Sequence, residues 1–269
     1  MKACANLFPV LFLMCLLSQH AQSQSSFENL KTVAISGPIA SASVDRVGEL
    51  YLVSQTGHIS KISINGEIIE SSNVKRVPTL FDPRDGSHIF LYWKDSRKYE
   101  LRLPDLKSIA ASKDIDSSFA IHPVLACPSG DHDLIVLDSA DWSLKKIDGR
   151  TNTVLHETII YEAGATSPNV TYMREYQNFV FLLDPVTGIN IYNRMGKLLK
   201  TLPGKSIPYF SFLGEEIYYP VQDGLHLFNL FTAEERTISL PTAAPFALLT
   251  DERLYLVSHD KVEIYSVTP

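Results

Sequence analysis

Cysteine is scarce in this chain, with three residues among 269, so a small fold held together by several disulfide bonds is excluded. Glycine and proline occur at ordinary levels, 13 and 15 residues, which excludes collagen-like and low-complexity sequences. No apolar run is long enough to cross a bilayer. The net charge of −6 offers no basic field for a phosphate backbone, so we expect neither a nucleic acid partner nor a membrane-spanning protein.

The N-terminus has the pattern of a secretory signal peptide. Lys2 precedes the apolar run Leu7–Leu17, and the small residues of Ala21-Gln22-Ser23 suit a signal peptidase. A buried helix is disfavoured because the run is short and contains Pro9. We therefore predict cleavage after Ser23, a signal peptide over residues 1–23, one domain over residues 24–269, and a periplasmic or secreted location.

Two cysteines, Cys4 and Cys15, lie within that predicted signal peptide. Lipidation of Cys15 is an alternative, but Met14 occupies the preceding position, where lipidation motifs usually have a small residue. After cleavage Cys127 alone remains, so no intramolecular disulfide can form and packing must stabilise the fold.

Six short apolar runs of strand length recur along the rest of the chain. Their central residues are 37 to 46 positions apart: Tyr51, Phe90, Ile135, Phe181, Tyr218 and Tyr255. A proline precedes each of them by ten to thirteen residues: Pro38, Pro78, Pro123, Pro168, Pro208 and Pro245. Proline is tolerated at the first residue of a strand, so each one is interpreted as opening a repeat.

Each repeat contains more than one strand signal. Turn-forming residues such as Cys127-Pro128-Ser129-Gly130-Asp131 separate an inner apolar segment from the central run, and a third strand follows it. Most repeats also have a fourth strand, as in Val154–Ile159 and Lys197–Leu202. Four strands in about 40 residues without an amphipathic helix predict an all-β, six-bladed β-propeller of four-stranded antiparallel blades.

The last repeat lacks its fourth strand because the sequence ends at Pro269. The segment Leu30–Ile35 precedes the first repeat and is strand-like. We predict that it pairs with Val262–Val267 and closes the ring. A β-sandwich or a barrel is the alternative fold class, but neither requires a repeat near 41 residues.

The first repeat resembles the TolB-like and NHL-type six-bladed propellers. The resemblance lies in Asp45–Val53 and Gly57–Ile62, which are similar to the D-x-x-G-x-(apolar)-Y-V and G-x-I-x-K segments of that group. The fold also resembles sugar-lactonase-like propellers, which imply an acidic and amide metal site. Asn169 alone offers part of such a site, so their activity is not carried over and no metal or cofactor is predicted.

The predicted inner strands contain no Asp or Glu, which disfavours chemistry at the central channel. They are residues 39–44, 78–81, 121–126, 168–173, 208–213 and 244–249. His122 is the one imidazole on them, and its odd offset from Cys127 places the two side chains on opposite faces. We interpret them as a hydrogen-bonded channel histidine and a small buried thiol. The acidic pairs Asp131 with Asp133 and Asp138 with Asp141 are expected to be solvated loop charges.

Two segments are candidate binding surfaces. Arg174-Glu175-Tyr176-Gln177-Asn178 is assigned to a turn of the fourth blade, where such large side chains suggest a contact surface or a local salt bridge. The other is Tyr92-Trp93-Lys94-Asp95-Ser96-Arg97-Lys98-Tyr99, assigned to the loop after the second strand of the second blade. It combines aromatic and cationic residues, which suits either an interface or blade packing. Trp142 is expected to pack between blades.

These observations together predict an exported, monomeric, non-catalytic scaffold that binds a protein or cell-envelope ligand. The candidate ligand-binding residues are His122, Asn169, Arg174, Glu175, Tyr176 and Trp93. The alternative is an exported hydrolase or lyase, similar to lactonases, that uses the mouth of the channel.

Overall fold

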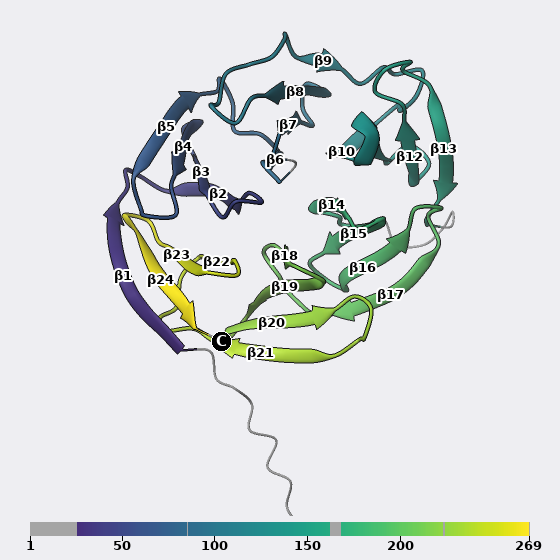
Figure 1. The fold of residues 1–269 in the computed structure, drawn as a ribbon. Coiled ribbons are helices and arrows are strands. Elements are labelled where there is room, and N and C mark those ends of the chain that lie inside the picture. Colours follow the sequence, from purple (N-terminus) through teal and green to yellow (C-terminus); the bar gives the residue numbers. More distant parts are fainter. Residues whose placement is uncertain (1–25, 85, 162–167, 223, 269) are drawn as a thin grey trace, which may run out of the picture.

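Six four-stranded antiparallel sheets form a ring around a central channel, so the protein is an all-β propeller with six blades (Figure 1). The computed structural model describes residues 26–84, 86–161, 168–222 and 224–268. The predicted signal peptide, residues 1–23, lies outside this range. Among the residues described, no helix has both the length and the apolar character that crossing a membrane requires.

Blades 1 to 5 take their four strands in chain order from the channel outward, and blade 6 does so for its first three strands. Blade 1 comprises β2 (Ile39–Val44), β3 (Leu50–Ser54), β4 (His58–Ile62) and β5 (Ile68–Asn73), and blade 2 comprises β6 (Leu80–Asp82), β7 (Ile89–Trp93), β8 (Lys98–Arg102) and β9 (Lys113–Asp114). Blade 3 comprises β10 (Pro123–Pro128), β11 (Leu134–Asp138), β12 (Ser143–Ile147) and β13 (Val154–Ile159), with the short 3₁₀ helix η1 (Gly130–His132) between β10 and β11.

The second half of the ring repeats the plan. Blade 4 comprises β14 (Tyr172–Tyr176), β15 (Phe179–Asp184), β16 (Gly188–Asn193) and β17 (Leu198–Pro203), and blade 5 comprises β18 (Ser211–Leu213), β19 (Glu216–Val221), β20 (Gly224–Asn229) and β21 (Glu235–Ser239). Blade 6 comprises β22 (Phe246–Leu249), β23 (Arg253–Val257), β24 (Lys261–Thr268) and, from the other end of the chain, β1 (Ser26–Ala34).

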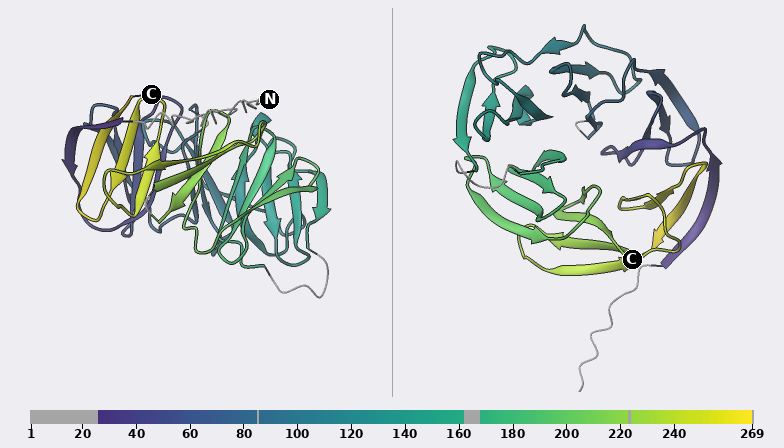
Figure 2. Two further views of the ribbon diagram at one scale, coloured as in Figure 1. Left: turned by 90° about the horizontal axis from the view of Figure 1, so that it is seen from below. Right: turned by 180° about the vertical axis from the view of Figure 1, so that it is seen from behind.

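Strand β1 completes blade 6, as the sequence predicts. It runs antiparallel to β24, with Val33 opposite Val262 and Phe27 opposite Val267. The two strands lie side by side at the rim of the ring in both face-on views (Figures 1 and 2). This pairing covers an edge that would otherwise be open and ties the two ends of the domain together.

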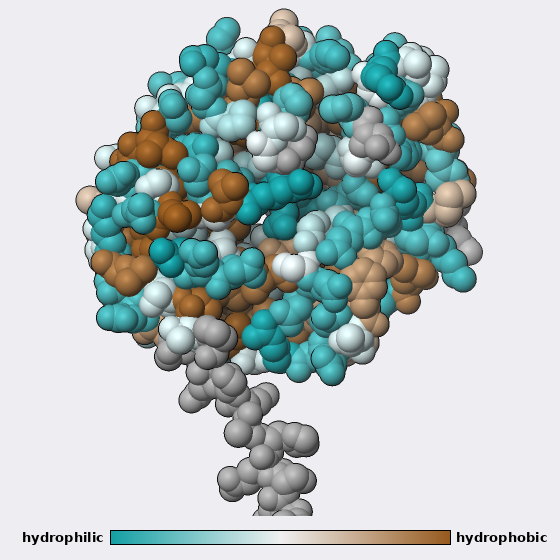
Figure 3. Space-filling view, viewed as in Figure 1, coloured by the Kyte–Doolittle hydropathy of each residue, from teal (hydrophilic) through white to brown (hydrophobic). Residues whose placement is uncertain are grey.

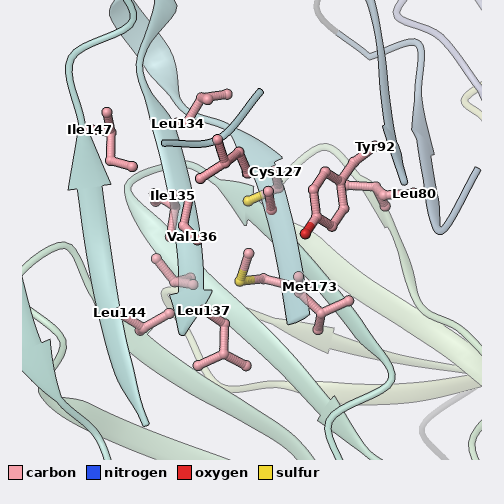
Figure 4. Close-up of a cluster of buried hydrophobic side chains, with 14 of the residues drawn as sticks. Leu80, Tyr92, Cys127, Leu134, Ile135, Val136, Leu137, Leu144, Ile147 and Met173 are labelled. Atoms are coloured by element: carbon pink, nitrogen blue, oxygen red, sulfur yellow. The ribbon is translucent and has the colours of Figure 1, made fainter. Parts of the chain in front are cut away.

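The hydrophobic core lies between the blades, because the second strand of every blade is apolar on both faces. Strands β3 and β11 are buried at every position. Figure 4 shows part of the cluster that β11 forms with residues of the neighbouring blades. Tyrosines also join blades by hydrogen bonds. The Tyr92 hydroxyl donates to the Pro123 carbonyl at 2.6 Å, and the Tyr255 hydroxyl donates to the Gly48 carbonyl at 2.7 Å. Cys127 is a buried free thiol in this cluster, as predicted, and burial raises its pKa.

Blade 2 has the least complete sheet among the described strands. Its outer strand β9 has two residues, and these pair only with Lys98 and Tyr99 of β8. The sequence contains no clear signal for a fourth strand here. The segment between β8 and β9 is held by local contacts, which include a bridge between Arg102 and Ser108 and a hydrogen bond from the Ile109 N–H to the Leu101 carbonyl.

Candidate functional site at the channel mouth

Three residues assigned from the sequence to a turn of blade 4 lie instead on the innermost strand. Arg174, Glu175 and Tyr176 belong to β14, and only Gln177 and Asn178 form the turn to β15. Both turn residues have positive φ, 48° and 68°, which is the backbone that a two-residue hairpin of matching twist requires. The prediction was wrong because a two-residue turn of this type needs neither glycine nor proline.

Arg174 reaches across the channel and forms an ion pair with Asp82 of blade 2. Both side chains are buried, with 5% and 7% of their surface exposed. The guanidinium also donates to the Phe81 carbonyl at 3.3 Å and to the Tyr172 hydroxyl at 2.8 Å. Burial by itself would lower the pKa of Arg174, but the Asp82 carboxylate and the Tyr172 hydroxyl together outweigh it, so that pKa lies above its ordinary value.

This ion pair corrects the prediction that the inner strands carry no acid. Asp82 ends β6 and Glu175 lies on β14, so carboxylates from two blades enter the channel. The segment Asp82-Pro83-Arg84-Asp85-Gly86 contains residues typical of turns, so the sequence places Asp82 in a turn. In the structure Asp82 ends β6, which has only three residues and is too short to show the alternation of apolar and polar residues that marks a strand. Asp82 and Arg84 were therefore missed as channel residues.

Arg84 also crosses the channel, from blade 2 to blade 5. Its Nη1 donates to the Phe212 carbonyl at 3.3 Å and lies 3.5 Å from the Ser211 hydroxyl. Its guanidinium carbon lies 4.8 Å from the ring centre of Tyr176 and 5.2 Å from that of Phe212. Burial, reinforced by the nearby Arg174 charge, lowers the pKa of Arg84.

A cavity of about 810 Å³ opens beside Arg84 and Asp82. Part of its wall belongs to the ends of the inner strands of blades 2 to 4 and to the turns that follow the inner strands of blades 1 to 4, and most of the rest belongs to the facing sides of blades 2 and 3. The cavity therefore extends from the channel outward between these two blades. Its polar and charged lining includes Arg46, Asp82, Arg84, His88, Lys113, His132, Asp133, Glu175 and Gln177, and its apolar lining includes Phe90, Tyr99, Leu101 and Leu134. On the face seen in Figure 3, hydrophilic side chains surround the hollow at the centre of the ring.

The charges that line this cavity are unevenly paired. Asp82 is paired with Arg174, and Asp133 is paired with Lys146 at 2.9 Å. By contrast, no carboxylate of the described chain lies within 4.0 Å of the charged nitrogens of Arg46, Arg84 or Lys113. Glu175 accepts a hydrogen bond from the Gly130 N–H at 3.2 Å.

Two of the acids predicted to be solvated are buried. Asp133 is 7% exposed and Asp138 is fully buried, so the prediction was wrong for both. Asp138 binds Lys145 Nζ at 2.8 Å. It also accepts backbone N–H groups of Ile121, His122 and Ala140 at 2.8 to 3.0 Å. Burial acts to raise the pKa of Asp138, but these hydrogen bonds outweigh it and lower that pKa.

The remaining candidate residues lie away from the cavity. His122 is exposed and precedes β10, so its assignment to an inner strand was wrong; its backbone N–H donates to Asp138. Asn169 is likewise exposed and precedes β14, with its N–H donating to Asp184 at 3.2 Å. Trp93 ends β7, and its indole N–H donates to the Arg76 carbonyl at 2.8 Å, while Trp142 packs edge-on against Tyr161. Glu175 and Tyr176 are the predicted residues that line the cavity.

No group of three or more His, Cys, Asp or Glu side chains suited to a metal ion occurs within the described ranges. No protein-family model matches the chain, and no curated protein matches it. The resemblance to TolB-like and NHL-type propellers therefore rests on the two segments of blade 1 alone.

Solved structures of other proteins are similar to this chain. The Pan2 WD40 domain of Neurospora crassa matches with a TM-score of 0.56 and 11% identity, over 92% of this chain and 97% of that chain. BamB from Moraxella catarrhalis matches with a TM-score of 0.45 and 13% identity, over 90% of this chain and 81% of its own. The computationally designed Ika8 protein matches with a TM-score of 0.48 and 11% identity, over 85% and 70% of the two chains. At this identity the Pan2 domain supports the propeller fold and nothing finer.

Proposed function

We propose that the protein is an exported, non-catalytic binding module that holds a protein partner against the channel mouth. The observation that carries this proposal is the cavity, which is open to a ligand and is lined by cations without carboxylate partners in the described chain. A large pocket with a few convergent polar groups is the usual form of a binding site. Export rests on the N-terminal sequence pattern.

A non-catalytic role is supported by the state of the reactive groups. Asp82 and Asp133 are held in ion pairs, so neither is free to act as a general base. The Cys127 thiol is buried and its pKa is raised, which opposes formation of the nucleophilic thiolate. The lining thus offers groups that position a ligand, and no activated nucleophile–base pair among the described residues.

The binding surface can be tested by blocking one face at a time. Asn178 lines the cavity, whereas Val186 is exposed in the turn between β15 and β16, at the other end of blade 4. Each is replaced by cysteine and labelled with maleimide-polyethylene glycol, while buried Cys127 stays unlabelled. We expect the label on Asn178→Cys to abolish capture of partners from an envelope extract, and the label on Val186→Cys to leave capture intact. Equal capture by both labelled proteins would reject the channel mouth as the binding surface.

The alternative, a hydrolase or lyase at the channel mouth, makes a different prediction. Such an enzyme that used a divalent metal would be stabilised by it, so calcium, magnesium or zinc would raise the melting temperature and a chelator would reverse the rise. A binding module without a metal site should melt at the same temperature in all of these conditions. Differential scanning calorimetry separates the two functions.

A further inference from the structure

We infer that the cavity between blades 2 and 3 binds an extended acidic peptide segment, with one carboxylate seated on Arg84. This inference rests on the proposed function and adds the chemistry of the ligand. It follows from the environment of Arg84, from the arrangement of Arg46 and Lys113, which also lack a carboxylate partner among the described residues, and from the apolar wall of the cavity.

The position of Arg84 favours a carboxylate ligand. Its position is fixed by the hydrogen bond to the Phe212 carbonyl and by the rings of Tyr176 and Phe212. Among the acids that the structure describes, Asp82 is the nearest to Arg84 in the sequence, and its carboxylate is already bound to Arg174. A guanidinium held in place and half-buried loses little entropy on binding, and its planar set of donors matches a carboxylate in a bidentate arrangement.

The shape of the cavity favours an extended peptide over a single small anion. Arg84 lies at the channel, whereas Lys113 lies on β9, the outermost strand of blade 2, so the cavity spans the width of this blade. Between them the apolar wall includes the half-buried Leu101 and the largely buried Phe90, Tyr99 and Leu134, with the ring centres of Phe90 and Tyr99 5.8 Å apart. The cavity thus has a cation at each end and an apolar wall between them. A peptide with an apolar side chain flanked by an acid on each side would complement it.

The remaining charges set limits on the ligand. Arg46 is exposed and comes from the turn of blade 1, so it adds a third cation at the channel end. Glu175 also lines the cavity and disfavours acids placed near it. Three cations in a protein of net charge −6 are too few to attract a nucleic acid backbone.

The experiment begins with phage display of random heptapeptides on the full domain, without any assumption about the partner. We expect peptides that carry an apolar or aromatic residue between acidic ones. The probe for all later measurements is the most enriched heptapeptide, compared with the same peptide in which glutamine and asparagine replace the acids. Isothermal titration calorimetry should give at least about tenfold weaker binding for the amide version, because the charge-assisted hydrogen bond from the guanidinium to a carboxylate is lost.

Variants then locate the acid. Arg84→Met should weaken binding of the probe by about tenfold or more, and Lys113→Met or Arg46→Met by about two- to fivefold, as for more exposed ion pairs. Glu175→Gln should tighten binding by a similar small factor because it removes a repulsive charge. Lys197 is an exposed cation outside the lining, so Lys197→Met serves as the matched control and should bind as the wild type does.

Arg84 also joins blades 2 and 5, so each variant is first checked by thermal melting. If Arg84→Met does not fold, the other variants still test whether the cavity prefers acids. Loss of Arg46 or Lys113 should weaken binding of the acidic probe, and Glu175→Gln should tighten it. Peptides without acids, a full-affinity amide probe, or variants that all bind like Lys197→Met would overturn the inference. Partner capture that is blocked at Asn178 but is insensitive to the charge variants would overturn the inference and leave the proposed function in place.

Discussion

Two junctions between blades of this ring differ in how completely they are closed. Blade 6 meets blade 1 at the seam, which we define as β1, β24 and the blade 1 residues packed on them. At the seam, β1 pairs with β24 over eight residue pairs. Beside it, the Tyr255 hydroxyl of β23 donates a hydrogen bond to the Gly48 carbonyl of blade 1. Blades 2 and 3 pack around Tyr92 and Cys127, and Met173 of blade 4 belongs to the same cluster (Figure 4). The cavity lies beside this cluster, at the turns and along the facing sides of blades 2 and 3. The outer strand of blade 2 has only two residues.

The difference shows where a closed ring can accommodate a binding site. The seam has to be closed, because an unpaired β24 would expose a strand edge and leave the ends of the domain untied. The junction of blades 2 and 3 is covalently continuous, so its blades remain neighbours even where they do not touch. Incomplete packing is therefore tolerated there, and the opening provides room for a ligand.

The largest expected effect comes from removing the seam. Deletion of Ser26–Ala34 should abolish cooperative thermal unfolding and cause aggregation, because β24 loses its partner strand. The matched change at the other junction is Asp114→Pro in β9, which should shift the melting temperature by only a few degrees. Calorimetry and gel filtration check both proteins. A soluble, cooperatively folding deletion would show that the seam is dispensable.

The second effect concerns the ion pair that crosses the channel. Asp82→Ala should lower the free energy of unfolding by about 3–5 kcal/mol, because it leaves the buried Arg174 guanidinium without its carboxylate. Adding Arg174→Met should recover part of this loss, since no unpaired charge then remains. Urea unfolding of the two single variants and the double variant measures the coupling. If the loss in the double variant equals the sum of the two single losses, the ion pair does not account for the lower stability of Asp82→Ala.

A smaller effect is expected at the packed end of the junction between blades 2 and 3. Asp138→Asn should cost about 1–3 kcal/mol at neutral pH, because Asp138 satisfies three backbone N–H groups and Lys145. The pKa of Asp138 is lowered in the folded protein, so its ionised form stabilises the fold above the ordinary value of 3.8. That contribution is lost as the pH falls below this value. The stability difference between wild type and variant should therefore shrink below about pH 4, as measured by urea unfolding across pH. A difference that does not change with pH would contradict this account.

The smallest effect compares two glycines of positive φ, one at each junction. Gly66 has φ +75°, and a Cβ there would lie 2.8 Å from Ile264 Cδ1 and 2.9 Å from Lys31 Cδ, across the seam. Gly86 has φ +78°, but its Cβ would meet only Arg46 Cδ at 3.7 Å. Both changes to alanine should cost about 1–2 kcal/mol for the backbone, and Gly66→Ala should cost more because the seam must also shift. Urea unfolding measures both variants. Equal losses of unfolding free energy would mean that the residues around Gly66 accommodate a methyl group as readily as those around Gly86.

Much of the fold could be predicted from the sequence because its signals are local and repeated. The spacing of the apolar runs predicted six blades, and Leu30–Ile35 was predicted to pair with the last one, as β1 does. The site was harder to predict. Arg174 and Asp82 are 92 positions apart and meet only across the channel, and the short β6 and the two-residue turn after β14 shifted their expected positions.

By itself, the sequence determined the repeat, the strands and the closure of the ring, because hydrophobic alternation and turn residues act over a few neighbouring positions. Only the tertiary structure decided which charges are paired and which face a cavity. The ion pair of Arg174 with Asp82, and the position of Arg84 in the cavity without a carboxylate partner among the described residues, depend on distances between blades that no local pattern encodes.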